Sequence, residues 1–250
     1  MDKSEQKQEL FSNDQKNTDI LRVSKNNFRS WNENMIDKYD PDVYHTQSNV
    51  LIKIIIKMLC KSMLNCLKIQ DRDKVVEVGC GAGNVLERLS IAGYLVGADI
   101  SLKLLQKSKK RCSDNTNLVA TDAEELPFKS KSFNKILCTE VIEHLMEPEK
   151  CLVEIKRIAT KDAVIVITTT NEPFVNKIKS IIWGLKFNKI LFRKNDYKPQ
   201  ERMDDEWHLH AFDPDSFKQI LEKYFGVEKI SFVPSKLFPI QMVAKCVSKR

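Results

Sequence analysis

A short run of acidic residues with a histidine combines groups that bind metals and move protons. It reads Thr-Glu-Val-Ile-Glu-His-Leu over residues 139–145. If this run forms a helical turn, Glu140, Glu143 and His144 share one face, because they stand at positions i, i+3 and i+4. Two carboxylates and an imidazole so placed can act as a general base, hold a divalent cation or support the fold. The sequence predicts a catalytic group of His144, Glu143 and Glu140, in which His144 is the candidate base.

A glycine-rich loop with an acidic residue in front of it is the second group. Residues 77–83 read Glu-Val-Gly-Cys-Gly-Ala-Gly and follow a β-branched run. Glycines let the backbone turn sharply and approach a ligand closely, and the residues after them offer free N–H groups. Dinucleotide sites have the spacing GxGxxG, whereas this loop has GxGxG. Glu77 would repel a pyrophosphate but would pair with an ammonium group, which predicts a ligand that carries one.

Two more carboxylates follow the next predicted strands. Asp99 ends the second strand, where a carboxylate can accept hydrogen bonds from both hydroxyls of a ribose. Asp122 follows the third strand and can accept from an adenine amino group, while the N–H of Ala123 meets a ring nitrogen. Because the carboxyl ends of parallel strands share one edge of a sheet, the acidic series from Glu77 to Asp122 predicts a nucleoside site at that edge.

Taken together, these segments resemble the successive motifs of class I S-adenosylmethionine-dependent methyltransferases. The motifs are residues 77–83, 99–101, 122–128 and 133–145. The resemblance covers about residues 75–171 and implies S-adenosylmethionine as the cofactor. The contacts that it implies are Glu77, Gly79, Cys80, Gly81, Gly83, Asp99, Ile100, Asp122, Ala123 and Glu140. One departure is Asn134, where the family commonly has an aspartate that is often structural.

The Glu-x-x-Glu-His run is similar to that of ubiquinone-biosynthesis O-methyltransferases and of small-RNA 2′-O-methyltransferases. In the second group two glutamates, a histidine and a later histidine hold magnesium. If this chain binds a metal, the resemblance implies Glu140, Glu143, His144 and His208 as ligands, with His210 as an alternative to His208. Such ligands favour magnesium, manganese or zinc over copper. Many small-molecule methyltransferases have a similar turn without a metal, and we therefore expect none.

Strands and helices alternate through the middle of the chain. The expected strands are 74–78, 94–99, 118–121, 135–138 and 163–169, and the expected helices are 84–92, 101–112, 148–159 and 213–224. Two last strands, 227–232 and 240–246, have no helix between them and should pair antiparallel at one edge. The sequence predicts a doubly wound Rossmann-like α/β fold, with a seven-stranded sheet that is mostly parallel and has an antiparallel C-terminal strand.

The remaining segments predict accessory parts. Residues 1–20 are polar and should form a flexible arm. Helices at 28–35 and 46–67 should form a helical cap over residues 21–70, ahead of a methyltransferase domain at 71–250 with a cap insertion at about 172–207. Within that insertion, residues 178–194 mix apolar and basic side chains without an acid. We expect this segment to cover the active site, and docking on a membrane surface is the alternative.

The composition limits which binding partners and which cellular compartment we expect. The 250 residues carry a formal charge of +7, with lysines scattered along the chain, which favours a solvated surface over a nucleic-acid site. Seven cysteines without a CxxC pair are typical of reduced thiols, so we expect a cytoplasmic protein. The expected acceptor is a small molecule. Alternatives are a lipid or quinone at a membrane, an RNA 2′-hydroxyl, and a scaffold subunit that binds the cofactor without catalysis. The acceptor atom and the oligomeric state stay open.

Overall fold

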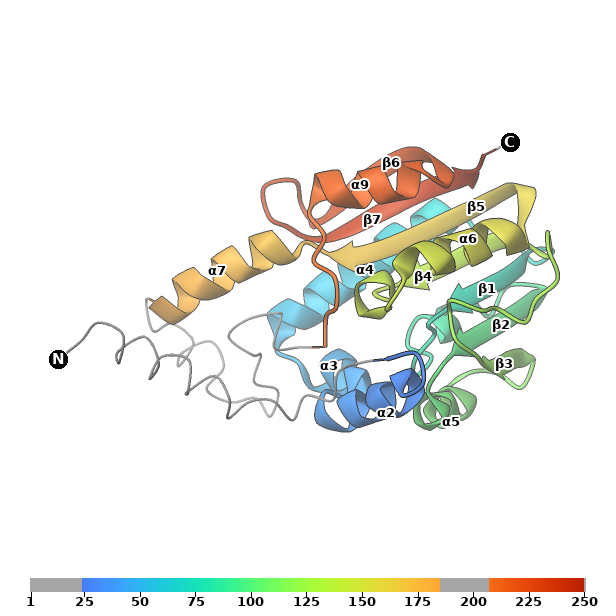
Figure 1. The fold of residues 1–250 in the computed structure, drawn as a ribbon, viewed down its shortest axis with the longest axis horizontal. Coiled ribbons are helices and arrows are strands. Elements are labelled where there is room, and N and C mark those ends of the chain that lie inside the picture. The colour runs from blue at the N-terminus through green and yellow to red at the C-terminus, as the bar shows by residue number, and fades with distance from the viewer. Residues whose placement is uncertain (1–23, 185–206, 250) are drawn as a thin grey trace, which may run out of the picture.

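The structure is a seven-stranded sheet covered by helices (Figure 1). The computed structural model describes residues 24–184 and 207–249. The arm expected at 1–20 and the greater part of the expected insertion therefore lie outside the described residues. Figure 1 shows helices α6 (Pro148–Ile158) and α9 (Pro214–Glu222) in front of the sheet and α4 (Val50–Leu67) behind it.

The sheet has the order β3-β2-β1-β4-β5-β7-β6. Its strands are β1 (Lys74–Val78), β2 (Tyr94–Asp99), β3 (Thr116–Ala120), β4 (Phe133–Thr139), β5 (Ala159–Thr170), β6 (Phe225–Pro234) and β7 (Pro239–Ser248). The first five strands pair in parallel, and β7 is antiparallel to both β5 and β6. The predicted fold class is confirmed, including the antiparallel C-terminal strand.

Continuous apolar runs explain why the central strands are buried. Val75, Val76 and Val78 of β1 have no exposed surface, as expected for a parallel strand that is covered on both faces.

Asn134, which stands where the family commonly has an aspartate, has a structural role in this chain. Its side chain donates to Asp73 at 2.7 Å and accepts from the N–H of Lys74 at 2.8 Å, so it ties the start of β1 to β4.

Within the described part of the expected cap, three helices form where the sequence predicted two. They are α2 (Phe28–Lys38), α3 (Pro41–Gln47) and α4. The single helix expected at 46–67 was wrong, because Ser48 is extended and Asn49 starts a new helix by accepting a hydrogen bond from the N–H of Ile52 at 2.9 Å. Within the described residues, no helix is both long and apolar enough to cross a membrane.

The helix expected at 84–92 was also wrong. Turns lead into a short 3-10 helix, η2 (Leu86–Leu89), whose first and last residues are both fully buried. Side chains three residues apart lie directly above one another in a 3-10 helix, so this geometry buries both leucines against the sheet. The helix capped by Ser101 forms as predicted, as α5 (Leu102–Arg111).

Candidate functional site

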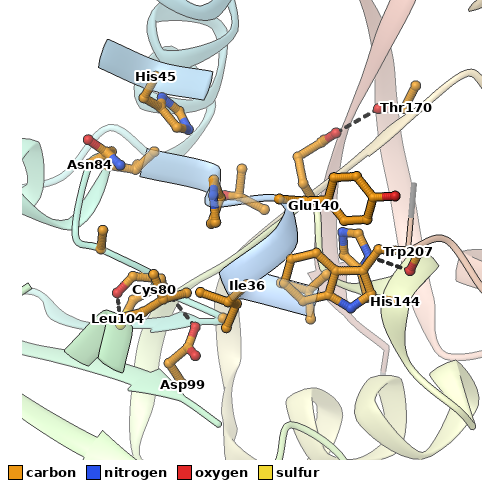
Figure 2. Close-up of a pocket in the computed structure, with 18 of the residues that line it drawn as sticks. Ile36, His45, Cys80, Asn84, Asp99, Leu104, Glu140, His144, Thr170 and Trp207 are labelled. Carbon is orange, nitrogen blue, oxygen red and sulfur yellow. Dashed lines mark hydrogen bonds between the residues drawn. The ribbon is translucent and has the colours of Figure 1, made fainter. Parts of the chain in front are cut away.

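A cavity of about 1030 Å³ opens at the carboxyl edge of the sheet. It is surrounded by the three cap helices, the glycine-rich loop and α7 (Glu172–Gly184). Its volume is at the upper end of the range for ligand pockets, so it has room for a second molecule beside a cofactor. In Figure 2, Asp99 and Cys80 lie on one side of the cavity, and Glu140 and His144 lie on the other. We call these the loop side and the histidine side.

Most of the predicted cofactor contacts line this cavity. They are Glu77, Gly79, Cys80, Gly81, Asp99, Ile100, Asp122, Ala123 and Glu140. Gly83 does not line it, because Gly83 packs against α5, where an added Cβ would lie 2.6 Å from the hydroxyl oxygen of Ser108. The acidic residues predicted from separate strand ends thus meet around one space.

Asp99 holds the glycine-rich loop as well as facing the cavity. Its Oδ2 accepts the N–H of Gly81 at 2.7 Å, and its Oδ1 accepts the N–H of Ser101 at 2.8 Å. Burial raises the pKa of Asp99, although these two backbone hydrogen bonds oppose the shift. A carboxylate oxygen has a second lone pair, so both oxygens can still accept ligand hydroxyls.

Glu77 is buried at the end of β1, and its Oε2 atom has no hydrogen-bonding partner among the described residues. Burial raises the pKa of Glu77 well above its usual value, and the nearby carboxylate of Asp99 adds to the shift. A buried carboxylate oxygen without a partner is costly, whereas a cation beside it would remove that cost. Glu77 therefore has the chemistry of a receptor for an ammonium group.

Gly79 has no room for a side chain. Its φ is +72°, and an added Cβ would lie 2.1 Å from Cγ2 of Val141. We expect Gly79→Ala to lower the free energy of unfolding by about 2–4 kcal/mol, from the left-handed backbone together with the collision. Urea denaturation measures this change.

Gly81→Ala is the matched control for that prediction. Its φ is also positive, +51°, but the nearest atom, in Leu104, is 3.9 Å from the added Cβ. We expect a loss of only about 1 kcal/mol, from the backbone alone. Equal losses in both variants would show that the contact with Val141 does not matter.

Ion pairs between three basic residues of α5 and three acidic residues fasten the cap to α5, and we call this set the charge ladder. Three basic residues at four-residue spacing on α5 pair with three acidic residues of the cap. The closest pairs are Lys103 with Asp37, Lys107 with Asp40, and Arg111 with Asp42. Arg111 also donates to the carbonyl of Ala82 at 2.5 Å, so the ladder reaches the glycine-rich loop. The sequence prediction missed it, although the spacing of four was visible.

The predicted helical turn of Glu140, Glu143 and His144 does not form. Glu140 has a φ of +52° and comes before a three-residue 3-10 helix, η3 (Ile142–His144). Its carboxylate turns toward β5, where the hydroxyls of Thr168 and Thr170 donate to it at 2.7 and 2.8 Å. Glu140 thus lines the cavity, while Glu143 is 1% exposed and does not.

Glu143, His144 and His208 nevertheless form a compact group on the histidine side. One ligand atom from each lies within 4.8 Å of the others. Both carboxylate oxygens of Glu143 are buried without a hydrogen-bonding partner among the described residues. The structure brings His208 to this group, whereas His210 is outside it. Glu140, the fourth predicted ligand, is not part of the group either, because the two threonines hold its carboxylate.

The two histidines are oriented by partners on their Nδ1 atoms. Nδ1 of His144 lies 3.0 Å from the carbonyl oxygen of Trp207, and Nδ1 of His208 contacts the carboxylate of Glu172. Since a carbonyl or a carboxylate only accepts, each Nδ1 carries the hydrogen, and Nε2 of the neutral ring keeps a free lone pair. The sequence prediction missed Glu172 and Trp207 in this role.

Burial and charge separate these groups by pKa. Burial lowers the pKa of His144 to about 3, with His208 adding to the effect. Burial raises the pKa of Glu143 to about 8, with the Glu140 carboxylate adding to it. Burial alone would lower the pKa of His208, but the hydrogen bond to Glu172, together with the charges of Glu143, Glu172 and Glu140, outweighs burial and raises the pKa. His208 is therefore the stronger base of the two histidines.

Comparison with known proteins gives both sequence and structural relatives. A family model described as a methyltransferase domain matches residues 76–167. An uncharacterized protein of Methanocaldococcus jannaschii is 35% identical over 124 residues, which are 49% of this chain and 47% of that protein. A demethylmenaquinone methyltransferase of Paenarthrobacter aurescens is 29% identical over 132 residues, 52% of this chain and 50% of that enzyme. The chain thus spans about half the length of these curated relatives.

A solved structure resembles nearly the whole chain. Magnesium protoporphyrin IX methyltransferase of Synechocystis, solved with bound SAH, aligns with a TM-score of 0.63 at 15% identity. The alignment covers 90% of this chain and 100% of that one. At this identity the likeness concerns the fold alone.

Proposed function

We propose that this chain, which carries a methyltransferase domain of the class I, S-adenosylmethionine-dependent kind, transfers the methyl group of S-adenosylmethionine to an apolar small molecule. The observation that carries the proposal is the meeting of Glu77, Asp99 and Asp122 around one cavity, next to the histidine side. Methyl transfer requires an in-line approach of the acceptor to the sulfonium methyl, so positioning dominates the chemistry.

The loop side fits S-adenosylmethionine by its chemistry. The unpartnered Oε2 of Glu77 suits the ammonium of the methionyl group, and Asp99 suits the ribose hydroxyls. Asp122 lines the cavity one strand further along, where it suits the adenine. When bound, the cofactor supplies the electrophilic methyl group, and the protein holds it in place.

The part of the cavity between α4 and α7 is mainly apolar, and we call it the acceptor half. Ile52, Ile55 and Leu59 of α4 line it from one side, and Ile178 of α7 lines it from another. Such walls favour an aromatic or lipid-like acceptor over a highly charged one. This composition supports a small apolar acceptor over an RNA end, because no basic row suited to phosphates lines this part of the described cavity.

For an acceptor that must lose a proton, we assign its removal to His208 with Glu172. His144 has a pKa of about 3 and would accept a proton weakly, so it suits orientation of the acceptor better than its deprotonation. Burial raises the pKa of Glu140, and a sulfonium cation bound in the same cavity would favour its carboxylate form, which Thr168 and Thr170 hold in place. The sequence predicted His144 as the general base, whereas this proposal gives that role to His208.

Transfer of label from methyl-labelled S-adenosylmethionine into solvent-extractable acceptors tests this function. We expect labelled apolar product together with S-adenosylhomocysteine. Ile55→Trp, which fills the acceptor half, should lower transfer by about tenfold or more while the protein still binds S-adenosylhomocysteine. Val153→Trp, at an exposed site on α6, is the control and should change neither property. Failure of the wild type to bind S-adenosylhomocysteine would contradict the proposal.

A metal-assisted reaction is the second candidate, and the group of Glu143, His144 and His208 favours it. Histidines that bind metals commonly donate their other ring N–H to a carbonyl or carboxylate, as both do here. Two imidazoles and a carboxylate suit zinc or manganese. A cation held there would lower the pKa of an acceptor hydroxyl and would complete the bonding of Glu143.

Titration of the chelator-treated protein with Mn²⁺ distinguishes the two candidates. If a metal is used, one ion should bind per chain, and Glu143→Gln should weaken binding by about 100-fold or more, because a ligand contributes at least as much as its supporting partners. His210→Gln, which changes a neighbouring histidine outside the group, should bind as the wild type does. A wild type that binds no Mn²⁺ and transfers methyl groups in its absence would rule out this candidate.

A further inference from the structure

Helix α4 exposes a stripe of large apolar side chains. Val50 is 75% exposed, Leu51 59%, Ile54 50% and Met58 39%. At 3.6 residues per turn, these four side chains fall within an arc of roughly 100°. Single exposed apolar residues are ordinary, but several gathered on one face of a helix mark a surface that binds something apolar.

A stripe of lysines runs beside the apolar stripe. Lys53, Lys57 and Lys61 are exposed and stand four residues apart. None of them forms an ion pair with another residue that the structure describes. The sequence of α4 contains no acidic residue, and the acids just before it are engaged by α5 through the charge ladder. The lysine stripe therefore presents three uncompensated positive charges.

A third face of α4 lines the cavity. Ile52, Ile55 and Leu59 line it, on the side of the helix opposite the exposed stripes. Leu51 both lines the cavity and is largely exposed, so the apolar stripe continues into the acceptor half of the cavity. Figure 1 shows α4 behind the sheet, with its N-terminal end on the same side of the molecule as α7.

We propose that α4 docks this protein on the surface of an anionic lipid bilayer, with the cavity mouth beside the lipid. The apolar stripe would lie among the acyl chains near the headgroups, and the lysine stripe would contact lipid phosphates, as in interfacial amphipathic helices. A second copy of the chain suits this surface less well, because it would bring two lysine stripes together. The docking itself does not depend on the proposed function. Only one consequence rests on that function, namely that the apolar acceptor could enter the cavity from the membrane.

Co-sedimentation with vesicles tests the docking. We expect the full chain to bind vesicles of phosphatidylcholine mixed with phosphatidylglycerol, and to bind pure phosphatidylcholine much more weakly. Changing Lys53, Lys57 and Lys61 together to glutamine should weaken binding on the order of 100-fold, at about fivefold for each lysine. Ile54→Ser combined with Met58→Ser should also weaken it, because both side chains are exposed and belong to the apolar stripe.

A matched triple variant controls for net charge. Lys109, Lys110 and Lys156 are exposed on α5 and α6, and changing all three to glutamine should leave vesicle binding unchanged. Equal losses in the two lysine triples, or no binding of the wild type to anionic vesicles, would overturn the docking proposal. Calorimetry with S-adenosylhomocysteine separates this failure from failure of the proposed function. Protein that binds vesicles but not S-adenosylhomocysteine would support docking and contradict the methyltransferase.

Discussion

Asp99→Ala is expected to bind S-adenosylhomocysteine on the order of 1000-fold more weakly than the wild type, as measured by calorimetric titration. In the structure Asp99 accepts the backbone N–H groups of Gly81 and Ser101, and the proposed ribose contacts would use its remaining lone pairs. A hydrogen bond to a charged group contributes about 1.5–3 kcal/mol, and two ribose contacts would be lost. The glycine-rich loop would also lose its anchor at Gly81.

Asp114→Ala controls for the loss of an acidic side chain, because Asp114 is exposed and does not line the cavity. This variant should bind as tightly as the wild type. If Asp99→Ala also bound as tightly as the wild type, the ribose could not be held by Asp99, and the loop side would need another ligand.

Binding of S-adenosylhomocysteine is expected to release a proton from Glu77. Without a ligand, burial raises the pKa of Glu77 well above its usual value, so the side chain is protonated below that raised pKa. An ammonium beside it favours the carboxylate and lowers the pKa. The affinity for S-adenosylhomocysteine should therefore strengthen by about tenfold per pH unit as pH rises toward the pKa that Glu77 has without a ligand. Above that ligand-free pKa the affinity should level off. Calorimetry in buffers of different ionisation heat measures the released proton.

Glu77→Gln should remove this pH dependence and weaken binding on the order of 100-fold above the ligand-free pKa, because the ammonium would lose its charged partner. Glu125→Gln, at an exposed position, should keep both the affinity and the pH dependence of the wild type. A pH dependence that persists in Glu77→Gln would assign the proton to another group.

The fold was predictable because its strands depend on local patterns. Apolar runs such as residues 163–167 are typical of parallel strands buried on both faces, and the absence of a helix between the last two strands predicted their antiparallel pairing. The helix boundaries at 46–67 and 84–92 were less predictable. The break at Ser48 depends on capping by Asn49, and the 3-10 turn depends on contacts with the sheet.

The site was predictable where each residue ends its own strand. Glu77, Asp99 and Asp122 could be placed together, because parallel topology fixes which strand ends meet. The histidine side depends on contacts between distant parts of the chain. His208 is 64 residues after His144, so no local spacing could decide between His208 and His210. The threonines that hold Glu140 were likewise hidden, because β4 and β5 must pair first.

The charge ladder also bears on how quickly each catalytic cycle can finish. In the proposed reaction, S-adenosylhomocysteine must leave a cavity that the cap helps to enclose, and the ladder holds that cap to α5. Its pairs are partly exposed, so added salt weakens them. Departure of the spent cofactor, rather than methyl transfer, would then quicken as ionic strength rises.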